Sequence, residues 1–124
     1  MDKNDKNTQI QELKDLLAAF RDKRDWKQFH NPKDLAEAIS IEAGELMELF
    51  LWQTKEEIAD KIKKDSDFKK DVRDELSDVI TFSVNFANAL DIDIVSAIKS
   101  KMEENDKKYP ADKARGVATK YNKL

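Results

Sequence analysis

Four acidic residues lie where a charged side chain is costly. On a helical wheel of about 100° per residue, Glu42 falls inside an apolar stripe and Glu45 borders it. Glu75 and Asp78 have the same relation to the apolar stripe of a later segment. The stripes consist of large hydrophobic residues, namely Leu35, Ile39, Leu46 and Leu49 in the first and Val72, Val79 and Phe86 in the second. Because an ionised carboxylate is almost never buried without a partner, these acids need a positive charge beside them.

Two kinds of partner satisfy these acids. Two pairs spaced three apart on separate helices can converge on one point, and an all-carboxylate site suits Mg²⁺, with Mn²⁺ as a substitute. Such ions keep coordination positions open for substrate phosphates. The alternative is that lysines of neighbouring helices pair with the acids at a helix–helix rim, because acids three residues apart are common in charged helices. Spacing alone leaves both alternatives open.

A second set of residues suggests a nucleotide site. Lys101 and Asn105 continue the helical face of Ile94 and Ile98, where a cation and an amide would suit a phosphate chain, although a surface lysine is the commoner explanation. Aromatic residues occur in a connector and at the end of a helical pattern, where they could stack on a base or fill the end of a bundle. These residues are Trp26 and Phe29, followed by the single histidine His30, and then Trp52.

Length and composition restrict the class of protein. A chain of 124 residues fits one domain over residues 1–124. Without cysteine it has no disulfide, zinc–thiolate site or thiol nucleophile, and one histidine excludes a two-histidine di-iron bundle. The net charge of −3 argues against a general nucleic-acid binder. Residues 1–7 are polar, and no apolar run has the length of a membrane span, so we expect a cytoplasmic protein without a membrane partner.

The hydrophobic periodicity predicts an all-α fold that resembles a four-helix bundle. Helix one follows a capping box at Thr8 and Gln11 and runs to about Asp25. Helix two starts at Asn31-Pro32 and runs to about Trp52. A short helix is expected at residues 56–62, a turn at 65–67, a long helix over 68–90, and a last helix capped by Asp91 that stops near Tyr109. Residues 1–7 and 111–124 are expected to be irregular tails.

Several segments resemble a known family. IEAGELMELF at residues 41–50 and DELSDVI at 74–80 look like the two metal motifs of MazG-type nucleoside triphosphate pyrophosphohydrolases. RDWKQFH at 24–30, FLWQ at 50–53 and KMEENDKKYP at 101–110 resemble its dCTP pyrophosphatase branch. The resemblance implies that Glu42, Glu45, Glu75 and Asp78 bind Mg²⁺. It also implies nucleotide contacts from Trp26, Phe29, His30, Trp52, Phe82, Lys101, Asn105 and Tyr109, and a homo-oligomer, either a dimer or a dimer of dimers.

Three positions depart from the family pattern. The first metal motif often opens with two glutamates, and here the first is Ile41. A tyrosine that often follows the last metal ligand by four residues is Phe82, and a histidine nine residues before the tryptophan is Leu17. The last two differences bear on base selectivity rather than on the chemistry.

The expected reaction is hydrolysis of a (deoxy)nucleoside triphosphate, dCTP and also dATP, to the monophosphate and pyrophosphate. Metal ions would neutralise the phosphates and activate water, Lys101 would add a fixed positive charge, and Glu45 is our candidate for the base. The alternative is a non-enzymatic helical interaction protein, which would explain the charge and the helices but not acids inside apolar stripes. A phosphatase is a third alternative, which would release a different product.

Overall fold

The computed structural model describes residues 2–124, which contain helices and no β-strand. The all-α prediction is therefore confirmed. These residues form two compact units, which divide between Asp91 and Ile92. Among them no single helix is long and apolar enough to cross a membrane. The bent pair of helices Ser66–Leu90 and Ile94–Lys108 meets that criterion only when the two are taken together.

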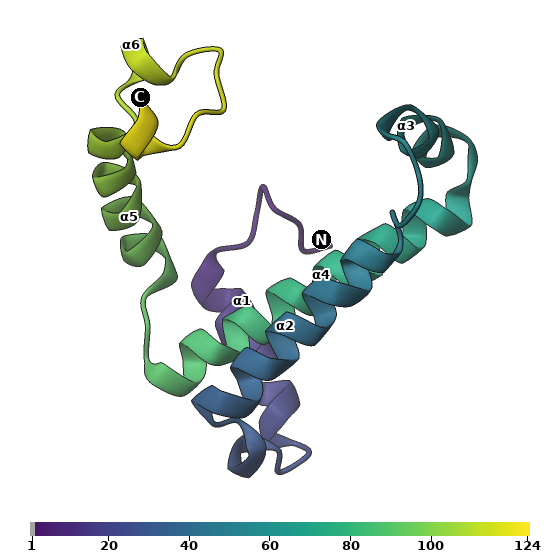
Figure 1. The fold of residues 1–124 in the computed structure, drawn as a ribbon. Coiled ribbons are helices and arrows are strands. Elements are labelled where there is room, and N and C mark those ends of the chain that lie inside the picture. Colours follow the sequence, from purple (N-terminus) through teal and green to yellow (C-terminus); the bar gives the residue numbers. More distant parts are fainter. Residues whose placement is uncertain (1) are drawn as a thin grey trace. The chain divides into compact units, whose positions relative to one another are not determined.

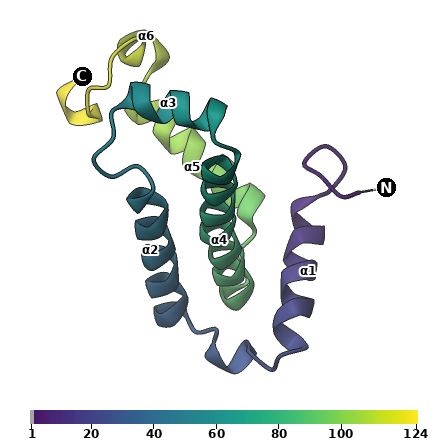
Figure 2. The same ribbon diagram turned by 90° about the vertical axis from the view of Figure 1, so that its right-hand side faces the viewer.

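The first unit contains four helices. They are α1 (Ile10–Asp22), α2 (Pro32–Glu48), α3 (Lys55–Lys64) and α4 (Ser66–Leu90). The long helix α4 contacts the other three, and its most extensive contact is with α2. As Figures 1 and 2 show, α2 runs antiparallel to α4, and α1 runs in the same direction as α4. The buried core consists of Leu35 from α2 and of Phe68, Val84 and Ala87 from α4.

Helices α2, α3 and α4 each start at a side-chain cap. The Asn31 side chain accepts a hydrogen bond from the Asp34 N–H, and Pro32 occupies the first helical position, as predicted. Thr54 and Asp65 accept the corresponding bonds ahead of α3 and α4. Helix α3 is longer than the predicted 56–62, and α4 begins at Ser66, inside the predicted turn, because Asp65 provides its cap.

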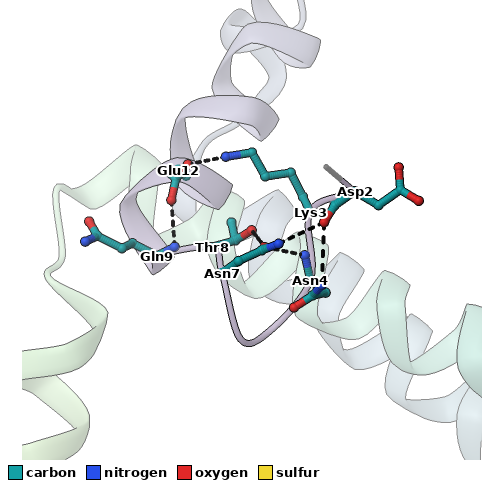
Figure 3. Close-up of polar contacts among 7 residues, drawn as sticks. All are labelled: Asp2, Lys3, Asn4, Asn7, Thr8, Gln9 and Glu12. Carbon is teal, nitrogen blue, oxygen red and sulfur yellow. Dashed lines mark hydrogen bonds and ion pairs between the residues drawn. The ribbon is translucent and has the colours of Figure 1, made fainter.

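The predicted capping box of the first helix is displaced by one residue. Glu12 Oε2 accepts from the Gln9 N–H at 2.8 Å and Glu12 Oε1 accepts from Lys3 Nζ at 2.6 Å (Figure 3). The box at Thr8 and Gln11 is thus wrong, since Gln11 donates to Asp15 instead. Residues 2–7 contain no helix, as expected, but they form a turn in which the Asn7 side chain accepts from the Asn4 N–H.

Two helices end earlier than predicted because the chain turns at a left-handed residue. Helix α1 ends at Asp22 rather than near Asp25, which has φ 53°. Helix α2 ends at Glu48, and residues 49–52 form turns that finish at Trp52 with φ 65°. Trp52 therefore lies beyond α2, not at its last turn.

The second unit contains α5 (Ile94–Lys108), α6 (Ala111–Ala114) and a 3₁₀ turn (Tyr121–Lys123). Asp93, not the predicted Asp91, caps α5 through a 2.8 Å bond from the Ser96 N–H. Asp91 ends α4 instead, with φ 52°. The tail after residue 110 is more ordered than expected, since α6 forms there and the Tyr109 and Tyr121 rings meet edge to face at 6.0 Å.

Candidate metal centre

Helices α2 and α4 bring three of the predicted acids together. Glu42 comes from α2, and Glu75 and Asp78 come from one face of α4, three residues apart. Each offers a carboxylate oxygen, and these oxygens all lie within 4.8 Å of one another. The antiparallel pairing of α2 and α4 is what joins these two sequence motifs at one point.

Two of these carboxylates are only partly exposed. Glu42 Oε2 and Glu75 Oε2 are buried, and neither has a hydrogen-bond partner. Asp78 is exposed to solvent. Among residues 2–124, none of the four predicted acids forms an ion pair with lysine, arginine or histidine. The alternative in which lysines satisfy these acids is therefore wrong for the described part of the chain.

The fourth predicted acid, Glu45, affects the pKa values of two of the other three. Burial raises the pKa of Glu42 from 4.5 to about 7, and the neighbouring Glu45, Asp78 and Glu75 add to this rise. Burial also raises the pKa of Glu75, again with contributions from Glu45 and Asp78. Because Glu45 contributes to the pKa shifts of both residues, we group it with Glu42, Glu75 and Asp78 and call the four residues the acid cluster.

The acid cluster fits a hard divalent cation. It offers only carboxylate oxygens, and two of these are buried without the partner that such atoms require. A cation at this point would satisfy both orphaned oxygens and remove the repulsion that raises the pKa of Glu42. The cluster can therefore hold a metal ion while Asp78 and Glu45, both exposed, keep one side open to solvent.

The aromatic residues predicted to bind a base lie in different surroundings. Trp52 is 91% exposed, so the alternative that it fills the end of a bundle is wrong. Trp26 packs edge to face on Phe20 at 6.0 Å, and Phe29 is exposed. Phe82 is half-buried on α4, one turn beyond Asp78.

The charge of Arg21, a residue that the sequence patterns did not single out, acts on His30. Its Nδ1 atom is buried without a hydrogen-bond partner, and its pKa is lowered by burial and then by the charge of Arg21. The Arg21 side chain is only 11% exposed, with Nε 2.8 Å from Asp22 Oδ1. Arg21 stands four residues after Leu17, on the apolar side of α1, and this position was the signal by which the sequence could have identified Arg21.

Lys101, Asn105 and Tyr109 belong to the second unit. Lys101 Nζ lies 3.0 Å from Glu104 Oε2 on the surface of α5. Asn105 and Tyr109 line one shallow groove there, together with Met102, Glu103, Asp106 and Lys107. Asn105 and Tyr109 of the predicted late basic motif thus share this groove, whose lining does not include Lys101.

Comparisons with known proteins find relatives over most of the chain. The sequence profile of the MazG-like family matches residues 38–124. The chain is 36% identical to dCTP pyrophosphatase 1 of Rattus norvegicus and 37% identical to that of Homo sapiens, in both cases over 115 residues. Each alignment covers 93% of this chain and 67% of the relative.

A solved structure has the same fold. The crystal structure of a pyrophosphatase from Archaeoglobus fulgidus superposes with a TM-score of 0.76 at 35% sequence identity. The match covers 89% of this chain and 98% of that one.

Proposed function

Because this chain belongs to the MazG-like family, we propose that it hydrolyses deoxynucleoside triphosphates between the α and β phosphates, with Mg²⁺ bound by the acid cluster. The products are the nucleoside monophosphate and pyrophosphate. The chain is an enzyme of the nucleoside triphosphate pyrophosphohydrolase class. A non-enzymatic helical interaction protein would leave the acids inside the apolar stripes unexplained.

The observation that carries this proposal is the pair of orphaned oxygens. Glu42 Oε2 and Glu75 Oε2 are buried without partners, and one carboxylate oxygen each from Glu42, Glu75 and Asp78 lie within 4.8 Å of one another. Such an arrangement is unfavourable in the free protein. It becomes favourable when a cation is bound, and cations held by carboxylates commonly take their remaining ligands from substrate phosphates.

The residues of the acid cluster have different roles in this proposal. Glu42, Glu45, Glu75 and Asp78 would hold the cation. When bound, the cation would neutralise phosphate charge and acidify water at the site. Glu45, which is exposed, is also the candidate that accepts a proton from the attacking water. The chain offers no cysteine nucleophile, so positioning and charge must supply most of the rate.

The remaining contacts are proposed from the family resemblance. Trp26, Phe29, Trp52 and Phe82 would hold the base, His30 would bind the sugar or a phosphate, and Lys101, Asn105 and Tyr109 would bind the triphosphate. The exposure of Trp52 supports its role, because an exposed ring can stack on a ligand at little cost to the fold.

We propose dCTP as the preferred substrate and dATP as a second one. Relatives from rat and human are named as dCTP pyrophosphatases. At two positions where that branch has polar side chains, this chain has Leu17 and Phe82. The loss of two hydrogen-bonding groups should leave the pocket less able to reject a second base.

The decisive assay uses the purified chain with each of the four dNTPs and Mg²⁺, or Mn²⁺ as its substitute. We expect pyrophosphate and a monophosphate from dCTP, a slower reaction with dATP, and no turnover when EDTA removes the metal. Release of orthophosphate would indicate a phosphatase. The absence of any product from all four dNTPs would contradict the proposed function.

A further inference from the structure

One buried polar residue of α4 has no role in the chemistry described above. Asn85 is only 8% exposed and is the one buried polar residue among those that the structure describes. Within residues 2–124 its side-chain amide has no hydrogen-bond partner, yet neither amide atom is among the fully buried polar atoms without one, so the amide stays accessible. An accessible amide on a mostly buried residue, with no partner in the fold, can bind a ligand or a water molecule.

Asn85 lies on the same side of α4 as the acid cluster. Glu75, Asp78, Phe82 and Asn85 follow one another at intervals of three, four and three residues, which places them along one face of the helix. With a rise of about 1.5 Å per residue, Asn85 lies about 10.5 Å along the axis from Asp78. This separation is comparable with the length of a nucleoside from its 5′ oxygen to the far edge of its base.

We propose that the Asn85 side chain recognises the base of the bound nucleotide by hydrogen bonds, an inference that rests on the proposed function. With the triphosphate at the acid cluster, a base lying along this face of α4 passes Phe82 and reaches Asn85. A side-chain amide offers two N–H donors and a carbonyl acceptor. Cytosine and adenine both present an amino donor next to a ring-nitrogen acceptor, which one orientation of this amide matches.

The same helix provides a matched control. Asn88 is three residues further along, and its Nδ2 donates to the Lys14 carbonyl oxygen at 3.0 Å, which joins α4 to α1. Its amide is therefore used within the fold, whereas that of Asn85 is not. Asn85→Ala should affect substrate affinity, and Asn88→Ala should affect stability.

The experiment compares kinetics and thermal unfolding of the full chain and both variants. For Asn85→Ala we expect the KM for dCTP to rise about tenfold or more, with a smaller change in kcat, because the base loses a buried partner. Its Tm without substrate should change little, since the amide makes no hydrogen bond within the described fold. For Asn88→Ala we expect a lower Tm and an unchanged KM.

Asn85→Asp tests the same inference without removing the side chain. A carboxylate has only acceptors, and guanine presents two adjacent donors on its pairing edge, N1–H and the 2-amino group. We expect the ratio of kcat/KM for dGTP to that for dCTP to increase in this variant. A merely structural residue would not change this ratio.

The possible failures can be told apart. If the parent protein hydrolyses no dNTP, the proposed function is wrong. If the parent is active and Asn85→Ala keeps its KM, only the assignment of Asn85 is wrong. If Asn85→Ala does not fold, the base preference of Asn85→Asp tests the assignment instead. An unchanged ratio of dGTP to dCTP hydrolysis would then show that the Asn85 side chain stabilises the fold and does not recognise the base.

Discussion

One carboxylate oxygen of Glu42 on α2 lies within 4.8 Å of a carboxylate oxygen of Glu75 on α4. Each of these residues also has a buried Oε2 atom without a hydrogen-bond partner. Two like charges at this distance, in partly dry surroundings, disfavour the ionised form of both groups. The pairing of α2 with α4 therefore places repulsion where these two helices meet, and a bound cation would relieve it.

The first prediction concerns Glu42→Gln and Glu75→Gln. Either substitution should abolish dNTP hydrolysis, because it removes a metal ligand, while the far-UV circular dichroism stays helical. In EDTA the Tm of each variant should be equal to or higher than that of the parent, since one repelling carboxylate is removed. Glu48→Gln, at the exposed end of α2, is the matched control and should retain activity. Near-normal turnover of Glu42→Gln at saturating Mg²⁺ would contradict the four-carboxylate site.

The second prediction concerns the pH dependence of stability in the metal-free protein. The folded-state pKa of Glu42 is about 7, above its ordinary value of 4.5. Between these values the folded protein binds more protons than the unfolded chain, so the free energy of unfolding falls as the pH rises. We expect the Tm in EDTA to decrease across this range, and the decrease to be smaller in Glu42→Gln. A parent and variant with parallel Tm profiles would show that Glu42 does not titrate in this way.

The third prediction concerns Trp52. Base–aromatic stacking contributes about 1–3 kcal/mol per base, so Trp52→Ala should raise the KM for the preferred dNTP strongly. Its Tm should change little, because the ring is 91% exposed. Trp26→Ala provides the comparison, since Trp26 packs on Phe20 and its removal should also lower the Tm. A Trp52→Ala variant that binds nucleotide as well as the parent would exclude stacking on this ring.

The fourth prediction is self-association. The first unit buries few large hydrophobic residues and exposes many on α2, on the turn that follows it and on α4, including Ile41, Met47, Leu51, Leu76 and Ile80. Small domains gain stability when such surfaces are covered by a second copy. Light scattering at micromolar concentration should give the mass of a homodimer or tetramer, and the Tm should rise with protein concentration. A monomer mass under these conditions would contradict this prediction.

Much of the secondary structure follows from local patterns. The periods of the apolar residues identify α1, α2, α4 and α5, because the side chains of one helical face recur every three or four positions. The Asn31-Pro32 start of α2 was also predictable, since a cap acts on the residues next to it. The caps at Thr8 and Asp91 were wrong because several polar residues compete there, and the path of the chain selects Gln9 and Asp93.

The sequence by itself determined the chemistry of the acid cluster. Glu42 and Glu75 stand out because each interrupts an apolar stripe, and this signal needs no knowledge of the other helix. Only the tertiary structure decided that the two carboxylates meet without a lysine between them, that Trp52 lies in solvent, and that Asn85 is buried without a partner. The physical reason is that helical periodicity is a local property, which tells only which face of a helix is apolar. The partner of a buried polar group is set by a non-local property, namely which helix packs against that face and in what register.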